Sequence, residues 1–341
     1  MFWTHLHAQI HRTLRQRQLL PSKERVLIAV SGGQDSLCLA QLLRDLQPKW
    51  GWEIAIAHCD HRWRADSSAN AEHVRQLANS WQLPFYLQTA TEPPVSEASA
   101  RQWRYQALSD IALKYSYKYI VTGHTASDRA ETLLYNLMRG SGADGLQALT
   151  WKRLLMVEGE YVSHLYIVRP LLEIVRAQTG EFCEKIGLKV WEDSTNADIK
   201  YTRNRIRREL IPYLQANFNP QVEQHLAQTA ELLRADVEYL EESARHLLEK
   251  SLSQNSVEVN NLSKNIRINR RTLQDAPLAI QRRAIRQLLQ KILTRAPNFE
   301  QVEKLTAMIS APNRYQTDPF PGGALARVEG DWICIQIQGQ L

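Results

Sequence analysis

The segment SGGQDS, residues 31–36, joins an apolar run to an amphipathic run and consists of residue types that bind phosphate. Gly32 and Gly33 can adopt backbone angles closed to other residues, and they have no side chain that would keep an anion from the backbone amides. Successive N–H groups and the positive end of a following helix form an anion-binding nest, to which Ser31 and Ser36 add hydroxyl donors. The segment therefore predicts a phosphate-binding loop.

This loop differs from the two commonest nucleotide-binding loops. A Walker loop, G-x-x-x-x-G-K-[ST], needs a lysine that reaches the β and γ phosphates, and residues 31–36 contain none. The dinucleotide pattern G-x-G-x-x-G does not fit either, which disfavours a dinucleotide-binding fold. The loop must therefore bind phosphate without a lysine.

Two more polar clusters follow apolar runs further along the chain, HCDHRWR at residues 58–64 and HTASD at residues 124–128. His124 and Asp128 are four residues apart at the start of a predicted helix, so their side chains share one face. In an open α/β sheet, ligands bind outside the carboxyl ends of the strands. We therefore expect the three clusters to meet at one edge of a sheet and to form a site.

The elements that must position these clusters are short β-branched runs that alternate with longer amphipathic runs. We predict strands at 25–30, 53–59, 84–89, 119–124 and 164–172, and helices at 35–46, 67–81, 96–117, 127–138 and 173–186. This alternation predicts an α/β fold with a doubly wound parallel sheet. A long helix at about 220–252 then leads to a mainly helical second domain that ends in a short β-hairpin. The predicted domains are residues 1–216 and 217–341.

Composition and charge limit the class of protein. The 341 residues are 44% hydrophobic, without an apolar stretch long enough to span a membrane and without the features of a secretory signal. We therefore expect a cytoplasmic protein with no membrane partner. The four cysteines include no C-x-x-C pair, so neither a zinc site nor a disulfide framework is indicated. The net charge of +6, with basic residues concentrated at 200–208 and 264–295, favours a polyanion such as RNA, although solvated helix faces explain it equally well.

In its position after an apolar strand, SGGQDS resembles the pyrophosphate loop of the PP-loop superfamily, the N-type ATP pyrophosphatases. The resemblance implies that the protein splits ATP between the α and β phosphates and adenylates an oxygen of its substrate. It also implies that the whole loop, Gln34 included, holds the departing pyrophosphate and that Asp35 holds Mg²⁺ against it. A loop with this task does not need the Walker lysine.

Longer motifs resemble one family of that superfamily, the tRNA(Ile)-lysidine synthetases. They cover most of residues 24–215 in the family's order and approximate spacing: HCDHRWR, ARQWRY (100–105), GHTASDRAETLLYNLMRGSGADGL (123–146), RPLL (169–172) and WEDSTNADIKYTRNRIR (191–207). The resemblance implies that ATP adenylates the C2 oxygen of cytidine 34 in the CAU anticodon of tRNA(Ile). The ε-amine of free L-lysine then attacks C2, which gives lysidine, AMP and diphosphate and changes decoding from methionine to isoleucine.

The resemblance also assigns roles to single residues. Arg104 is expected to neutralise developing negative charge, and either His124 or Asp128 is expected to accept a proton from lysine, a choice that stays open. His58 and Arg139 are expected beside the nucleotide. With Asp35, these residues make up the expected catalytic and cofactor-binding set. The expected RNA contacts are Arg64, Arg203, Asn204, Arg207 and Arg208.

The chain departs from the family pattern at two places. Thr125 and Ser127 stand where relatives often have the second histidine and the first aspartate of His-His-x-Asp-Asp. Arg62 and Trp63 stand where relatives commonly have the Gly-Leu of His-Gly-Leu-Arg. If relatives bind a metal ion through positions 125 and 127, this chain lacks those ligands.

Other functions and assemblies stay open. A tRNA-thiolating enzyme of the same superfamily would use the same adenylation, but it needs a reactive thiol or an iron–sulfur site, and Cys59 has no partner cysteine nearby in sequence. A small-molecule amide synthetase would not explain the basic C-terminal region. A non-catalytic RNA-binding protein on this scaffold would not explain why the loop and the His124 cluster are intact. A homodimer is compatible with the sequence but is not indicated by it.

Overall fold

A computed structural model describes residues 3–157, 160–191, 202–252, 258–260, 263–293 and 295–338 of the chain. The chain forms two compact units, residues 1–234 and residues 235–341, and each unit is described by itself. Within the described ranges, no helix has both the length and the apolar content needed to cross a lipid bilayer.

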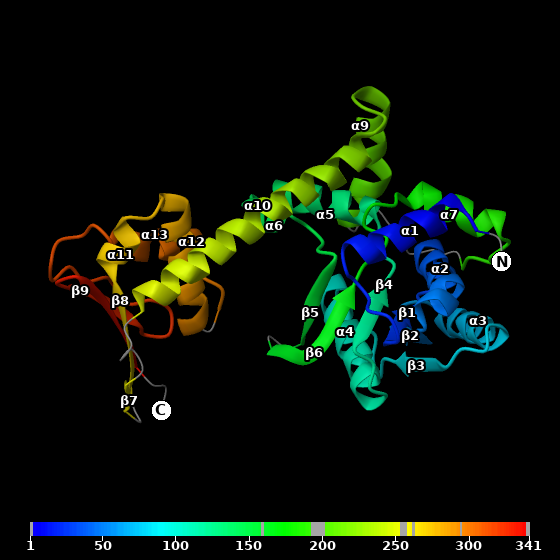
Figure 1. The fold of residues 1–341 in the computed structure, drawn as a ribbon, viewed down its shortest axis with the longest axis horizontal. Helices are drawn as coiled ribbons and strands as arrows, with labels where there is room; N and C mark the ends of the chain where they lie inside the picture. The colour runs from blue at the N-terminus through cyan, green and yellow to red at the C-terminus, as the bar shows by residue number, and fades with distance from the viewer. Residues whose placement is uncertain are drawn as a thin grey trace. The chain divides into compact units, whose positions relative to one another are not determined.

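A six-stranded sheet in the order β3-β2-β1-β4-β6-β5 forms the centre of the first unit (Figure 1). Neighbouring strands run parallel except β5, which runs antiparallel to β6 at one edge. The chain moves outward from β1 to β3 and then returns to the other side of β1, so the order reverses between β1 and β4. The predicted doubly wound α/β fold is confirmed. The strands are β1 (Arg25–Ala29), β2 (Glu53–Asp60), β3 (Phe85–Thr89), β4 (Tyr119–Thr122), β5 (Lys152–Val157) and β6 (Glu160–Val168).

Helices cover both faces of this sheet, and the side chains of β1 show why. Val26 and Ile28 face a core that contains side chains of α1, α2, α3 and α7, whereas Leu27 faces a second core built on α4. A strand that is apolar on both faces must be covered on both sides, as is usual in parallel sheets. These helices are α1 (His5–Gln16), α2 (Gln34–Trp50), α3 (Ser67–Ser80), α4 (Glu97–Lys114) and α7 (Arg176–Lys185).

The remaining helices of the first unit follow β4 and the segment after residue 201. Gly140, with φ of +73°, ends α5 (Ala126–Met138), and the single turn α6 (Ala143–Leu146) follows it. Helix α8 (Thr202–Arg205) continues through one π-helical turn, η2 (Ile206–Leu210), into α9 (Ile211–Asn217). Pro212 stands in the first turn of α9 and has no N–H to donate backward, and the wide turn lies directly before it.

Helix α10 (Val222–Ser251) begins in the first unit and ends in the second. The second unit contains an antiparallel sheet in the order β7-β8-β10-β9, whose apolar face packs on helical residues such as Leu288. The predicted C-terminal hairpin is confirmed, because β9 and β10 pair on either side of Gly330, which has φ of +62°. The elements are β7 (Glu258–Asn260), β8 (Ser263–Asn269), α11 (Arg270–Gln274), α12 (Leu278–Ile292), α13 (Phe299–Ala307), β9 (Leu325–Glu329) and β10 (Trp332–Gln338).

Candidate active site

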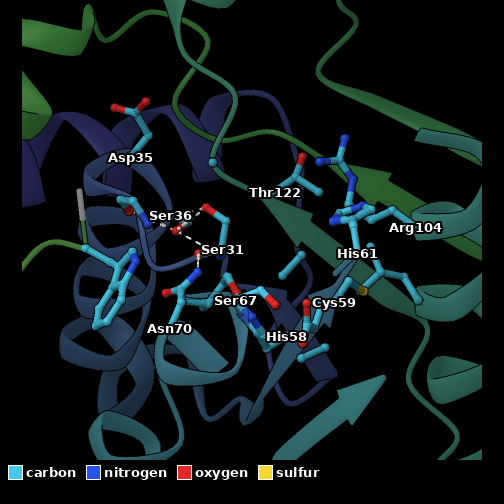
Figure 2. Close-up of a pocket in the computed structure, with 18 of the residues that line it drawn as sticks. Ser31, Asp35, Ser36, His58, Cys59, His61, Ser67, Asn70, Arg104 and Thr122 are labelled. Atoms are coloured by element: carbon cyan, nitrogen blue, oxygen red, sulfur yellow. Dashed lines mark hydrogen bonds between the residues drawn. The ribbon is translucent and has the colours of Figure 1, made fainter. Parts of the chain in front are cut away.

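Hydrogen bonds within the loop at residues 31–36 hold it at the end of β1. Ser36 Oγ accepts from the Ser31 backbone N–H at 3.1 Å and donates to the Gly33 carbonyl at 2.9 Å. Asn70 of α3 donates to the Ser31 carbonyl at 2.9 Å (Figure 2). Because Gly33 is the N-cap of α2, the loop presents its amides at the positive end of a 17-residue helix. This arrangement favours an anion.

Two glycines are required because neighbouring atoms approach them closely. Gly32 has φ of +91°, and a Cβ there would lie 2.1 Å from Asn70 Oδ1. Gly123 follows β4, and a Cβ there would lie 2.9 Å from backbone atoms of Asp35 and Ser36. Any larger residue at position 123 would push the end of β4 away from the loop.

Asp35, in the first turn of α2, is held by residues of α7. Thr179 donates a short hydrogen bond to Asp35 Oδ1, and Arg176 Nε lies 3.7 Å from Oδ2. Burial raises the pKa of Asp35 above its usual value. The side chain is nevertheless 14% exposed and lines the cavity next to the loop. Its carboxylate can therefore bind a cation that enters with phosphate.

The loop opens into a cavity of about 430 Å³ at the carboxyl ends of β1, β2 and β4. This is the point at which the strand order reverses, where ligands of open α/β sheets usually bind. Figure 2 shows Ser31 and Ser36 on one side of this cavity, with His61 and Arg104 close together on the other. Sequence-predicted residues that line it are Ser31, Gly33, Asp35, Ser36, His58, Arg64, Arg104, His124, Asp128 and Arg207.

His58, near the end of β2, supports the strand that precedes the loop. Its Nδ1 donates to the Val30 carbonyl at 2.7 Å, which leaves the Nε2 lone pair free. The residue is only 3% exposed, and burial lowers the pKa of its imidazole. His58 is therefore an uncharged group beside the cavity.

His124 and Asp128 face the same cavity from the end of β4 and the start of α5. His124 Nδ1 hydrogen-bonds Thr122 Oγ1 at 2.8 Å, and burial together with nearby arginines holds the pKa of His124 well below its usual value. Asp128 Oδ2 accepts from the Thr125 N–H at 2.8 Å and from its hydroxyl at 2.9 Å. Arg207 Nη2 lies 3.3 Å from Asp128 Oδ1. The histidine is thus uncharged, and both oxygens of the aspartate are engaged.

A second cavity of about 210 Å³ adjoins the first, since His124, Asp128 and Arg207 line both. Arg207 forms a bidentate pair with Glu131, with Nε–Oε1 2.5 Å and Nη2–Oε2 2.9 Å. The Glu131 side chain is 4% exposed, and burial raises its pKa against the opposing effect of Arg207. The other polar residues that line this cavity are Glu97, Arg101, Thr132, Arg203 and Asn204.

Comparison with known proteins identifies the family. A family model described as a PP-loop domain matches residues 4–214. The chain is 64% identical to the tRNA(Ile)-lysidine synthase of a Nostoc species over 98% of each chain, and 50% identical to that of a Synechocystis species over 100% of each. The chain belongs to the tRNA(Ile)-lysidine synthase family.

A solved structure supports the fold independently. The U34-tRNA thiolase of Methanococcus maripaludis matches 67% of this chain and 78% of its own chain, with a TM-score of 0.55 and 14% sequence identity. At this identity the similarity shows the fold alone.

The structure explains one departure of this tRNA(Ile)-lysidine synthase family member from the common pattern. Arg62 stands where the family resemblance predicts a glycine, and its backbone is left-handed, with φ of +57°. Asp60 Oδ1 accepts from the Arg62 N–H at 2.8 Å, and the Arg62 guanidinium donates to the Thr91 carbonyl at 3.2 Å. These bonds hold a conformation that is unfavourable for a residue with a Cβ. Trp63, the neighbouring departure, donates to the Pro94 carbonyl at 2.6 Å.

The other departure also has a structural role. Thr125 is fully buried and is the N-cap of α5, where it forms a capping box with Asp128. Ser127 Oγ accepts from the Arg176 N–H at 2.9 Å and so links α5 to the start of α7. In the part of the chain that the structure describes, no three His, Cys, Asp or Glu side chains cluster as a metal site. A metal ion here would need ligands from the substrate as well as from Asp35.

Several sequence-predicted residues lie outside both cavities. The Gln34 side chain turns to α7, where it donates to the Arg176 carbonyl at 2.7 Å. Arg139 is exposed and donates to Tyr135 Oη at 2.6 Å, and Arg208 is exposed on η2. Gly32 supports the loop without lining the cavity. Residues 192–201 of the predicted motif, Tyr201 included, lie outside the described residues.

Sequence reasoning missed several polar residues that line the cavities, and three of them are charged or amide side chains with a direct bearing on the site. Asn70 and Arg176 line the first cavity, and Arg101 lines the second. Arg101 stands three residues before Arg104 in ARQWRY, a spacing that places both on one helix face and was available as a signal. No motif marked Asn70 or Arg176.

Proposed function

We propose that this protein ligates free L-lysine to C2 of cytidine 34 in the CAU anticodon of tRNA(Ile), with ATP converted to AMP and diphosphate. Membership of the tRNA(Ile)-lysidine synthase family along nearly the whole chain supports this function. The observation that carries it is structural: a phosphate loop without a lysine opens into one cavity that also contains Arg104, His124 and Asp128. The expected cytoplasmic location belongs to the same proposal.

The loop end of the cavity is the proposed site of the ATP phosphates. Backbone amides of residues 31–36 and the hydroxyls of Ser31 and Ser36 bind the departing pyrophosphate, because they stand at the positive end of α2. Asp35 suits Mg²⁺, which in proteins usually takes one or two carboxylates together with substrate phosphates and water. The ion would reduce the charge repulsion between the phosphates and an attacking oxygen.

Arg104, on the far side of the cavity, is the proposed partner of the reacting base. Cytidine 34 must leave its stack to bring its C2 oxygen to the α phosphate. A guanidinium at this point stabilises negative charge that develops during adenylation. Arg64 is only 12% exposed at its side chain, and it lines the cavity from the loop after β2. We assign Arg64 to orienting the RNA at the mouth of the site.

The second cavity is the proposed lysine site. Lysine carries two ammonium groups and one carboxylate, and the cavity offers Glu97, Asp128 and Glu131 as acids and Arg101 and Arg203 as cations. The two cavities meet at His124 and Asp128, so a lysine bound in the smaller one directs its side chain toward the adenylated base. Arg207 holds the two acids Asp128 and Glu131 in place.

Transfer RNA contacts outside the cavities are proposed for exposed basic residues. Arg208 on η2 and basic residues of the predicted second domain, residues 217–341, would bind backbone phosphates. Part of the basic sequence there is already neutralised, because Arg282 pairs with Glu303 at 2.6 Å and Arg286 pairs with Glu241 at 2.6 Å. The RNA footprint is therefore smaller than the sequence charge implies.

The test is a ligation assay with the purified full chain, ATP, Mg²⁺, labelled L-lysine and a tRNA(Ile) transcript with a CAU anticodon. We expect label to enter this tRNA and not the methionine tRNA, with AMP and pyrophosphate released in equal amounts. Release of ADP and orthophosphate, or the absence of ATP-dependent label, would contradict the proposal.

A further inference from the structure

This inference concerns Arg62 and Trp63, the two residues that stand where the family resemblance predicts Gly-Leu. Both lie in the segment after β2, both are exposed, and both line the larger cavity. Trp63 is 39% exposed, although tryptophan is highly buried on average. Its ring therefore forms part of the surface that a substrate meets at the mouth of this cavity. The inference rests on the proposed function.

Hydrogen bonds fix the Trp63 segment to the segment after β3. The Trp63 indole N–H donates to the Pro94 carbonyl at 2.6 Å, and the Arg62 guanidinium donates to the Thr91 carbonyl at 3.2 Å. These bonds hold the indole in place before any ligand binds. A side chain that is already ordered loses less entropy when it makes a contact.

Two further aromatic rings pack beside the indole and form an aromatic cluster with it. The ring centroids of His61 and Trp63 are 5.7 Å apart, with the ring planes inclined by 32°. Trp103 of α4 packs edge-on against His61, with ring centroids 4.9 Å apart. Burial and the charge of Arg104 lower the pKa of His61 to about 4, so this ring is uncharged at neutral pH. The aromatic cluster thus connects the cavity mouth to α4.

Cations surround the aromatic cluster. Arg62 and Arg64 flank Trp63 in sequence, and Arg104 lies close to His61 (Figure 2). All three arginines line the larger cavity. In the part of the chain that the structure describes, the Arg62 guanidinium has no carboxylate partner. An aromatic ring among guanidiniums suits a nucleic-acid strand, whose bases stack on the ring and whose phosphates contact the cations.

The proposed reaction creates a need for such a surface. Cytidine 34 must leave its stack to enter the cavity, and its departure uncovers one face of each neighbouring base. Unstacked bases bind well on aromatic side chains, because every base has a π face. A fixed indole at the cavity mouth can cover one of the uncovered faces and so offset part of the cost of unstacking.

ATP has a different surface available for its adenine. The wall of the larger cavity includes Ala57 of β2 and Leu108 of α4, which are each 1% exposed. With its phosphates at residues 31–36, ATP can place its adenine against this buried apolar wall. The exposed indole at the mouth is then left for the RNA.

We propose that Trp63 is a stacking surface for a base next to cytidine 34 in the anticodon loop, with Arg62 at an adjacent phosphate. The contact is noncovalent and stabilises the opened loop while cytidine 34 is in the cavity. Because stacking tolerates any base, Trp63 raises the affinity for tRNA without selecting a sequence.

The first experiment measures contact between the indole and a base. The chain has nine tryptophans, so the signal of Trp63 is the difference in fluorescence between the wild-type chain and Trp63→Phe. A stacked base quenches indole emission, so a tRNA(Ile) transcript at saturation should lower this difference signal. A transcript that is abasic at the two positions flanking cytidine 34 should quench it less. A difference signal that the intact transcript leaves unchanged would contradict the stack.

The second experiment compares the tRNA affinities of two variants at position 63. Trp63→Phe and Trp63→Leu both lose the indole bond to Pro94, but only the first keeps an aromatic face. Trp63→Leu should weaken tRNA binding about tenfold, whereas Trp63→Phe should stay within about threefold of wild type. Trp3→Leu is the matched control, because Trp3 is 46% exposed and lines neither cavity, and it should bind tRNA as wild type does. Equal losses for the two variants at position 63 would overturn the proposal.

The abasic transcript completes a double-mutant cycle. If Trp63 acts through a flanking base, Trp63→Leu and the abasic transcript together should weaken binding about as much as the stronger single change. Fully additive losses would contradict a contact between them.

The KM for ATP separates RNA from adenine as the occupant of the ring. In the Trp63→Leu variant it should stay within about twofold of wild type. A raised KM for ATP with unchanged tRNA affinity would assign the ring to adenine and overturn the proposal. If the wild-type chain binds tRNA but transfers no lysine, the proposed function has failed, whereas quenching and affinity still decide the role of Trp63.

Discussion

Arg129 and Glu231 form an ion pair of 2.6 Å that joins helix α5 to helix α10. Arg129 is 1% exposed and directly follows Asp128 in sequence. The same carboxylate accepts from Arg17 at 2.8 Å, from Arg234 at 2.9 Å and from the Trp151 indole at 2.8 Å. One acid thus fixes the helix that carries Asp128 to the long helix that leaves the first unit.

We expect Glu231→Gln to lower the free energy of unfolding by about 3 kcal/mol, because it leaves the buried Arg129 without a counter-charge. Burial alone would raise the pKa of Glu231, but Arg234, Trp151 and Arg129 outweigh it and lower the pKa to about 2. A lowered pKa means that this stability is present above about pH 4.5 and is lost as pH falls toward 2. Urea unfolding at several pH values measures it. Glu249→Gln, at an exposed position of the same helix, should change the free energy of unfolding little.

Asp35→Ala should lower AMP formation by about 10³-fold, since it removes the proposed Mg²⁺ ligand beside the phosphates. Thr179→Val is the more informative change. It removes a hydrogen bond that lowers the pKa of Asp35 and leaves the effect of burial, which raises it. AMP formation should then need a higher pH and more Mg²⁺, whereas Thr179→Ser should behave as wild type. Identical Mg²⁺ titrations of the Val and Ser variants at about pH 6 would contradict this role for Asp35.

Arg207 and Arg208 are neighbours in sequence with different expected effects. Arg207→Ala breaks the bidentate pair with the buried Glu131, so it should lower the rate of lysine transfer and destabilise the first unit by about 3 kcal/mol. A lysine side chain at position 207 cannot form the two parallel hydrogen bonds to Glu131, so Arg207→Lys should also lower the rate of lysine transfer.

Arg208→Ala should weaken tRNA binding and reduce the slope of log affinity against log salt by about 1, with transfer of bound substrate unchanged. Filter binding at several salt concentrations measures the slope. Arg282→Ala is the matched control, because Arg282 already pairs with Glu303 and should alter the slope less. A larger change of slope for Arg282→Ala than for Arg208→Ala would contradict an RNA contact at Arg208.

Cys59→Ser should keep lysine transfer within a fewfold of wild type. Burial raises the pKa of the Cys59 thiol to about 12, so it is a poor nucleophile. A sulfur-transfer function that uses this thiol would be lost in the variant. Assay of lysine and of sulfur incorporation in the same tRNA therefore separates the two functions.

The sequence predicted the parallel core well because each strand there has a strong apolar run and a helix after it. It missed β5, which begins with two charged residues, Lys152 and Arg153, and lies antiparallel at the edge of the sheet. It also missed α1, whose capping box pairs Thr4 with His7, where Glu or Gln is the usual partner. Tertiary packing decides the structure of β5, whereas α1 has a local helical pattern, with Leu6, Ile10 and Leu14 four residues apart, that the sequence prediction overlooked.

The site was predictable where its residues stand at strand ends, since topology brings such positions together. Helix α7 supplies Arg176 and Thr179 from a segment without a recognisable motif, and only the packing of α7 on α2 places them beside Asp35. The setting of Tyr105 was equally hidden. The arginines near its ring come from α4, β5 and the chain after β6, so their convergence exists only in three dimensions.

The capping box at the start of α5 has a consequence for how this enzyme can change. Asp128 both faces the substrate cavity and completes the first turn of its own helix with Thr125. A mutation at position 128 therefore destabilises the first turn of α5 and also removes a functional group. Descendants that lose ligation but still bind RNA are expected to keep an aspartate here because it stabilises the helix, and not because it takes part in the reaction.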